Sequence, residues 1–172
     1  MAKPYSPPVP HAGSYLWRLR QKIGNALVLM PGAMVVLQRA DGCVLLTRRT
    51  DDGSWCLPAG AAEIDGSFAL TAVEEVLEET GILVSEKDLL PFACLSEAEA
   101  HTISYPNGDV THCFALCFLA RTWDGDPFPD RTESTEVKFV ELDAVPEPIH
   151  PPTAHALQLL ATYLESGTFQ VR

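Results

Sequence analysis

The chain carries an unusual cluster of carboxylates. Four glutamates fall within six residues, namely Glu74, Glu75, Glu78 and Glu79. No Lys or Arg occurs between Thr50 and Glu86. Like charges repel at i,i+4 on a helix, so a group outside the helix must neutralise these carboxylates. A hard divalent cation with oxygen ligands is the favoured candidate. The alternative is a solvated acidic helix face, which the absence of neighbouring basic residues disfavours.

The spacing of three of these residues suits metal-assisted phosphoryl chemistry. Glu75, Glu78 and Glu79 stand at i, i+3 and i+4, so their carboxylates converge on one patch about a turn long. Mg²⁺ usually keeps several coordination positions for water and substrate phosphates. The preceding turn, Pro58-Ala59-Gly60, can present a backbone carbonyl towards the same ions.

Two arginines close the strand that precedes this turn. Arg48 and Arg49 could meet the phosphates of a substrate through charge-assisted hydrogen bonds. The alternative for both is a surface ion pair.

Helical periodicity runs from Phe68 to Thr80. At about 100° per residue, the apolar side chains that share one side are Ala69, Ala72, Val73, Val76 and Leu77. Glu74, Glu75 and Glu78 are expected opposite them, with Glu79 at the boundary. Gly81 is expected to end the helix.

The other elements follow from hydrophobic periodicity and turn residues. Helices are predicted at 14–22 and 153–166, and strands at 26–30, 33–38, 44–48, 55–58, 89–95, 98–105, 110–120 and 136–142. Pro31-Gly32 is expected to separate the first two strands, and Asp41-Gly42 and Asn107-Gly108 are hairpin turns. Strands and helices intermix, which predicts an α+β fold with a mixed β-sheet sandwiched between helices.

Length and composition predict one globular domain at 14–172 behind a Pro-rich arm at 1–13 that lacks a signal pattern. The net charge of −11 disfavours a nucleic-acid or anionic membrane surface. The longest apolar run, at 26–37, is too short to span a bilayer. Five cysteines without a C-x-x-C pair make disulfides and a cysteine zinc site unlikely. A reduced, cytoplasmic protein is expected.

The stretch from Leu57 to Ile82 resembles the Nudix box, G-x5-E-x7-R-E-U-x-E-E-x-G-U, in which U is a bulky aliphatic residue. The matching positions are Gly60, Glu75, Val76, Glu78, Glu79, Gly81 and Ile82. Trp55 followed by LPAG resembles the family's W-x-L-P-G-G entry to the box, and LLTRR at 45–49 resembles the strand before it. Most of residues 24–145 fits a Nudix domain.

This resemblance implies a hydrolase that uses Mg²⁺ or Mn²⁺ to cleave a nucleoside diphosphate linked to another group. Carried over by position, the metal ligands would be Glu75, Glu78, Glu79 and the carbonyl of Ala59. Several family members draw a general base from a later loop, so Glu133 and Glu136 are the candidates here. The alternative for both is a solvated loop charge.

Two positions depart from the family pattern. Gly66 stands where the box has its first glutamate, with Asp65 beside it, and Glu74 stands where the box has arginine. In the family that arginine holds nearby carboxylates in place, including the one that corresponds to Glu63. In this chain, Glu63 and Glu74 are expected to repel each other unless another cation compensates.

The leading hypothesis is therefore a pyrophosphohydrolase of a small nucleotide, either a nucleotide sugar such as ADP-ribose or a nucleoside triphosphate. The competing hypothesis is a Nudix-fold module that binds a nucleotide without cleaving it. No nucleic-acid or membrane partner is expected, and a homodimer is possible.

Overall fold

The structure is a computed structural model that describes residues 12–105 and 107–172. The predicted arm at 1–13 lies outside these residues except for Ala12 and Gly13. The helical elements are α1 (Tyr15–Ile23), α2 (Phe68–Thr80), η1 (Glu86–Asp88), α3 (Ala98–His101) and α4 (Pro151–Ser166). The strands are β1 (Val28–Leu37), β2 (Val44–Arg49), β3 (Trp55–Cys56), β4 (Ala59–Ala61), β5 (Leu90–Leu95), β6 (Thr102–Ser104), β7 (Val110–Ala120), β8 (Ser134–Val140) and β9 (Gln170–Val171).

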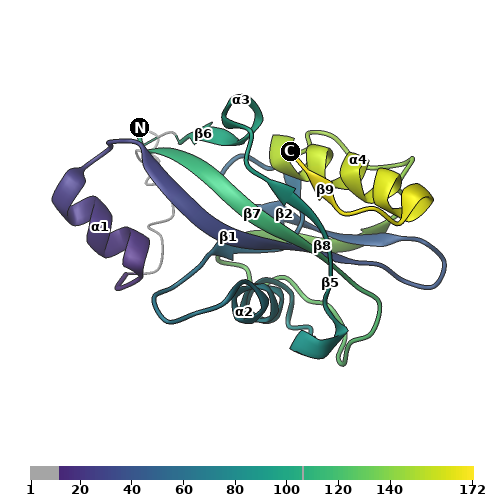
Figure 1. The fold of residues 1–172 in the computed structure, drawn as a ribbon. Helices are drawn as coiled ribbons and strands as arrows, with labels where there is room; N and C mark the ends of the chain where they lie inside the picture. The colour runs from purple at the N-terminus through teal and green to yellow at the C-terminus, as the bar shows by residue number, and fades with distance from the viewer. Residues whose placement is uncertain (1–11, 106) are drawn as a thin grey trace.

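The strands form two sheets. The larger sheet has the order β4-β1-β7-β5-β9, with β6 paired to β7, and the smaller has the order β3-β2-β8. Helices α2 and α4 lie on opposite sides of the larger sheet (Figure 1). The predicted α+β class and the helix-covered mixed sheet are confirmed, and the second sheet refines that prediction.

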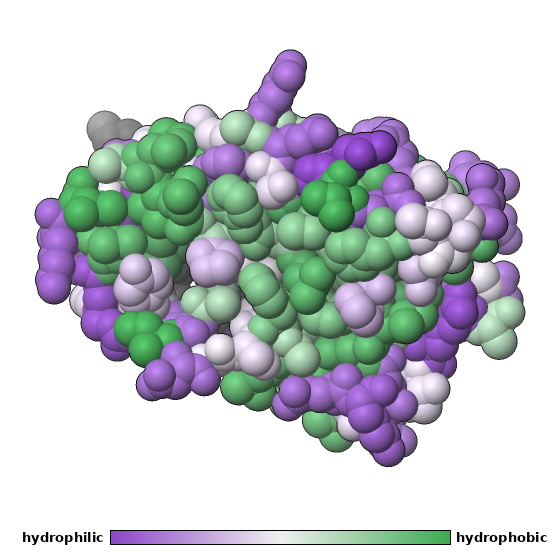
Figure 2. Space-filling model, viewed as in Figure 1, coloured by the Kyte–Doolittle hydropathy of each residue, from purple (hydrophilic) through white to green (hydrophobic). Residues whose placement is uncertain are grey.

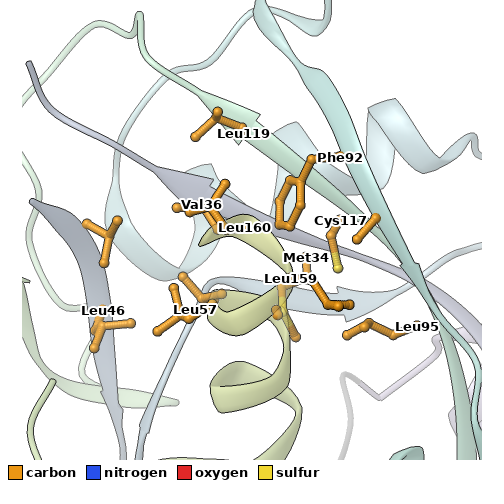
Figure 3. Close-up of a cluster of buried hydrophobic side chains, with 14 of the residues drawn as sticks. Met34, Val36, Leu46, Leu57, Phe92, Leu95, Cys117, Leu119, Leu159 and Leu160 are labelled. Carbon is orange, nitrogen blue, oxygen red and sulfur yellow. The ribbon is translucent and has the colours of Figure 1, made fainter. Parts of the chain in front are cut away.

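Two apolar cores hold these layers together. The first lies among α4, the larger sheet and the smaller sheet, with Phe92, Leu57 and Leu160 at its centre (Figure 3). The second joins α2 to the other face of the larger sheet through side chains such as Val35, Val76 and Phe118. Strand β1 contributes to both cores because successive side chains of a strand point to opposite faces.

Strand β1 runs without a break through Pro31 and Gly32, so the predicted division into strands at 26–30 and 33–38 is wrong. Pro31 is tolerated because it faces the edge strand β4, where its carbonyl accepts a hydrogen bond of 2.9 Å from Ala62 N–H. Gly32 permits a close approach, since a Cβ there would lie 2.3 Å from the carbonyl oxygen of Gly60.

The predicted turn at Asp41-Gly42 forms, because Arg39 N–H donates to the Cys43 carbonyl and Gly42 N–H to the Arg39 carbonyl, but the antiparallel pairing around it is short. Strands β1 and β2 belong to different sheets, and a bridge between Gln38, just after β1, and Val44 links them in the backbone. Strand β1 instead pairs with β7 in parallel along its whole length, and β2 pairs with β3 and β8.

Three further predictions change in detail. Residues 98–105 were expected to form one strand, but they begin as the short helix α3, because the Ala and Glu residues there favour helix. Strand β8 begins two residues earlier than the predicted 136–142, and α4 begins at Pro151, a residue that suits the first helical turn. Strand β9, which was not predicted, adds to β5 in parallel.

Apolar side chains also reach the surface. On the face shown in Figure 2 they extend from α1 across the strands of the larger sheet. The large apolar side chains that are exposed include Ile23 on α1, Leu29 on β1 and Phe114 on β7. Within the described ranges, no helix combines the length and the apolar character needed to cross a membrane.

Candidate active site

Helix α2 carries the four clustered glutamates and has well-defined ends. The Ser67 hydroxyl accepts a hydrogen bond of 3.0 Å from Leu70 N–H, which caps the first turn. Gly81 ends the helix in the left-handed region, with φ of 71°, and donates its N–H to the Leu77 carbonyl. The predicted span of 68–80 is confirmed.

The rotation of α2 about its axis differs from the prediction. The buried residues are Thr71, Ala72, Val76 and Thr80, whereas Leu77, which was expected to pack, is 43% exposed. Thr80 can be buried because its hydroxyl donates to the Val76 carbonyl within the helix.

This rotation separates the four glutamates into two pairs. Glu75 and Glu79 flank the buried stripe and are half-buried, whereas Glu74 and Glu78 are exposed. The expectation that Glu75 lies opposite the packed side was therefore wrong.

The carboxylate of Glu75 lies directly against the backbone of β4. A Cβ added at Gly60 would fall 1.9 Å from Oε1 and 2.1 Å from Cδ of Glu75. Any side chain at position 60 would therefore displace the Glu75 carboxylate from the place it occupies.

Residue 59 contacts the second half-buried glutamate. Ala59 N–H donates a hydrogen bond of 3.2 Å to Oε1 of Glu79. In the antiparallel β1–β4 pair, Ala59 lies opposite Met34, between the positions that bond across the ladder. Its N–H and C=O therefore both point away from β1, which turns the Ala59 carbonyl to the strand edge that Glu79 approaches.

Burial and repulsion raise the pKa of both half-buried carboxyls. Burial, followed by the charges of Glu78, Glu133 and Glu74, raises the pKa of Glu75 to about 7. Burial, followed by the charges of Glu75 and Glu133, raises the pKa of Glu79 well above its usual value, although Ala59 N–H and Arg49 oppose that shift. A cation at this position would relieve the repulsion.

The loop before β8 fixes Glu133 beside these carboxyls. The Asp130 carboxylate accepts hydrogen bonds from the N–H groups of Glu133 and Ser134 and from the hydroxyls of Thr132 and Ser134. The Glu133 carbonyl accepts a bond of 2.9 Å from Thr50 N–H. Asp130 was not identified from the sequence, although a short acidic residue followed by Thr and Ser is a signal for such a turn.

The two candidates for the general base therefore lie in different surroundings. Glu133 acts electrostatically on both Glu75 and Glu79. Glu136 is exposed and forms an ion pair of 2.6 Å with Arg48, its cross-strand partner. The structure thus brings Glu133, but not Glu136, towards the carboxylate cluster.

The two arginines also differ. Arg48 donates to Glu136 and to the Gly53 carbonyl, and its guanidinium lies 5.9 Å from the centre of the Trp55 ring. Arg49 pairs with Asp51 at 2.5 Å and lowers the pKa of Glu79 by its charge. Arg49 is therefore the arginine that acts on the cluster.

The oxygen atoms at this site fit a hard divalent cation, although the predicted ligand set is not preassembled. Among residues 12–105 and 107–172, no group of three or more His, Cys, Asp or Glu side chains already has an arrangement that could hold a metal ion. Glu75 and Glu79 offer half-buried carboxylates, and Mg²⁺ commonly uses one or two carboxylates completed by water and phosphates. The assignment of Glu75, Glu78, Glu79 and the Ala59 carbonyl as ligands stays a prediction.

The departure at positions 65 and 66 has a conformational side. Asp65 has φ of 66°, in the left-handed region that glycine adopts without strain. Gly66, the next residue, lies outside that region. A Cβ at Gly66 would lie 3.1 Å from the Glu63 carbonyl oxygen, so a glutamate there requires a small shift of the turn.

Comparison with known proteins identifies related chains. The sequence pattern described as the NUDIX domain matches residues 28–160. A "MutT-like protein" of Streptomyces ambofaciens is 44% identical over 54 residues, which cover 31% of this chain and 35% of that protein. The chain thus matches about a third of the length of that relative.

Solved structures share the fold at low sequence identity. An ADP-ribose pyrophosphatase from Streptococcus suis has a TM-score of 0.63 at 23% identity, covering 83% of this chain and 98% of that one. A MutT NUDIX hydrolase from Burkholderia pseudomallei has a TM-score of 0.60 at 23% identity, covering 77% and 98%.

Replacement of Gly60 tests the contact with Glu75. Gly60→Ala is expected to weaken Mn²⁺ binding about ten- to a hundredfold, because the new methyl group displaces the carboxylate. Titration followed by electron paramagnetic resonance measures the affinity. Ala61→Ser, on the same strand, is the control and should bind Mn²⁺ like the wild type. Equal affinities for the two variants would contradict the assignment.

Proposed function

Because the chain belongs to the NUDIX domain family, we propose that it hydrolyses a pyrophosphate bond in a nucleoside diphosphate derivative with the help of Mg²⁺ or Mn²⁺. The substrate is a nucleotide sugar such as ADP-ribose or a nucleoside triphosphate. The observation that carries the proposal is the half-buried pair Glu75 and Glu79, which lies against β4. The charge of a third carboxylate, that of Glu133, raises the pKa of both.

Oxygen atoms from α2 and β4 would hold the metal. Glu75, Glu78 and Glu79 supply carboxylates, and Ala59 supplies its carbonyl. A bound divalent ion offsets the charge of the pyrophosphate oxygens and lowers the pKa of a bound water. Gly60 keeps the space that Glu75 needs. Ala59 N–H and the Thr47 hydroxyl each donate to one carboxylate oxygen of Glu79 and so orient it.

Glu133 is the proposed general base. It takes a proton from the water that attacks phosphorus, and the bond from that phosphorus to the bridging oxygen breaks. The bonds from Asp130 and Thr50 to its backbone support this role, because a base must be held within reach of the reacting water.

Arg49 is the better placed of the two arginines for a substrate phosphate. Its charge already acts on Glu79, and a phosphate could exchange with Asp51 for the guanidinium. Arg48 remains occupied by Glu136 on the exposed side of the sheet.

The five free thiols, of which Cys56 and Cys117 are buried, are consistent with a reducing compartment. The cytoplasmic location and the homodimer stay predictions.

A panel of nucleotides tests the activity. With Mg²⁺ or Mn²⁺ present, ADP-ribose, other nucleotide sugars and nucleoside triphosphates are incubated with the protein, and products are separated by ion-exchange chromatography. At least one substrate should be cleaved, and Glu78→Gln should lower its kcat, because a carboxylate ligand is lost. An absence of turnover with every substrate would refute the proposal.

A pair of variants tests the assignment of the base. Glu133→Gln is expected to lower kcat about a hundredfold or more, because a positioned base contributes rates of that order. Glu136 lies three residues further on, within β8, and Glu136→Gln should leave kcat within about threefold of the wild type. A larger loss with Glu136→Gln than with Glu133→Gln would reverse the assignment.

Gly66 and Glu74 favour a second candidate function, a module that binds a nucleotide without cleaving it. These residues stand where the family pattern has Glu and Arg, and Glu74 helps to raise the pKa of Glu75.

Restoration of the family pattern distinguishes the two functions. The variant Asp65→Gly/Gly66→Glu/Glu74→Arg places glycine at the left-handed position and removes one source of repulsion. The hydrolase proposal expects turnover in the wild type and at most about a tenfold gain in the restored variant. Activity that appears only after restoration, with nucleotide binding in both proteins by calorimetry, would support the binding module.

A further inference from the structure

A contact between α1 and the loop before α2 has a bearing on the candidate site. Tyr15 N–H donates to both carboxylate oxygens of Glu63, each at 2.9 Å. Tyr15 is the first residue of α1, and the first N–H groups of a helix have no partner within it. The positive end of the helix dipole also favours a carboxylate there.

Helix α1 is anchored at its other end. The buried Arg20 guanidinium donates to the carbonyls of Gly24, Ala26 and Val110. It also lies 3.6 Å from the carboxylate of Asp109. These bonds hold α1 at the start of β7, at one end of the larger sheet (Figure 1). The N-terminus of α1 is thus held in place to meet Glu63.

Glu63 belongs to the short connection between the two elements that carry the candidate site. Strand β4 ends at Ala61, and the cap of α2 is Ser67. The Glu63 carbonyl accepts a bond of 3.1 Å from Gly66 N–H, which closes the turn. A constraint on Glu63 is therefore a constraint on the spacing between Gly60 and Glu75.

The local sequence offers no cation for this task. No Lys or Arg lies between Thr50 and Glu86, so neither β4, the connection nor α2 can supply a basic partner to Glu63. We propose that the N-terminus of α1 is a positioning element, which holds Glu63 through Tyr15 N–H and thereby keeps Gly60 against Glu75. The catalytic consequence rests on the proposed function, whereas the structural coupling does not.

A proline at position 15 removes the donor, places Cδ where the amide hydrogen faced Glu63, and is compatible with the helix. Proline lacks an N–H and is well suited to the first helical position. The preceding residue, Ser14, already has φ of −62° and ψ of 161°, which a following proline favours. Tyr15→Ala is the matched control, because it removes the same side chain and keeps the N–H.

Two readouts follow the coupling. Tyr15→Pro is expected to speed hydrogen exchange of the Gly66 amide at least about fivefold and to weaken Mn²⁺ binding about three- to tenfold, a range that matches the typical net contribution of one hydrogen bond. Tyr15→Ala should match the wild type in both. Exchange is measured on the metal-free full chain by nuclear magnetic resonance, so it does not depend on activity.

A double-mutant cycle identifies Glu63 as the residue through which the helix acts. Tyr15→Pro should have no further effect in a Glu63→Ala background, since the coupling is already lost. Additive effects on Mn²⁺ affinity would overturn the inference, as would equal exchange of Gly66 in Tyr15→Pro and Tyr15→Ala. If the protein proves not to be a hydrolase, the exchange measurement still decides whether the inference holds.

Discussion

Repulsion among half-buried carboxylates is the constraint on which the site depends. Burial raises the pKa of both Glu75 and Glu79, the charge of Glu75 raises that of Glu79 further, and the charge of Glu133 acts on both. Helix α2 carries no basic residue in its last turn. Two residues of β4 accommodate these carboxylates: Gly60 leaves room for that of Glu75, and Ala59 N–H donates to that of Glu79. A cation bound beside these carboxylates would offset a cost that folding alone leaves in place.

Strand β1 connects this corner to the rest of the molecule. Its side chains enter both cores, and its edge approaches β4 so closely that only glycine fits at position 32. Pro31 beside it removes a donor that faces only an edge strand, so the parallel ladder with β7 remains intact. The position of Ala59 and Gly60 is thus set by packing that extends across the larger sheet. The carboxylates come from α2, whose ends are set by the local capping residues Ser67 and Gly81.

Local signals allowed much of this structure to be predicted. The bounds of α2 follow from its periodicity and from Gly81, and the resemblance to the Nudix box identified the family. The rotation of α2 was missed because the buried Thr71 and Thr80 count as polar in a sequence pattern. Thr80 can nevertheless pack in the core, since its hydroxyl bonds within the helix. The partners of β1 and the difference between Glu133 and Glu136 depend on residues far away along the chain, such as β7 and Asp130, so no local pattern contains them.

Helix α1 and strand β9 lie outside residues 28–160, the stretch that matches the NUDIX domain pattern. Both nevertheless form hydrogen bonds with that stretch. Helix α1 meets Glu63 and β7, and β9 adds to β5, where Arg172 N–H donates to the Cys94 carbonyl. The stretch that matches the family pattern is therefore shorter than the unit that hydrogen bonds hold together. A fragment cut to residues 28–160 would retain every residue of the box, but it would leave Glu63 without its helix and the edge of β5 open to intermolecular strand pairing.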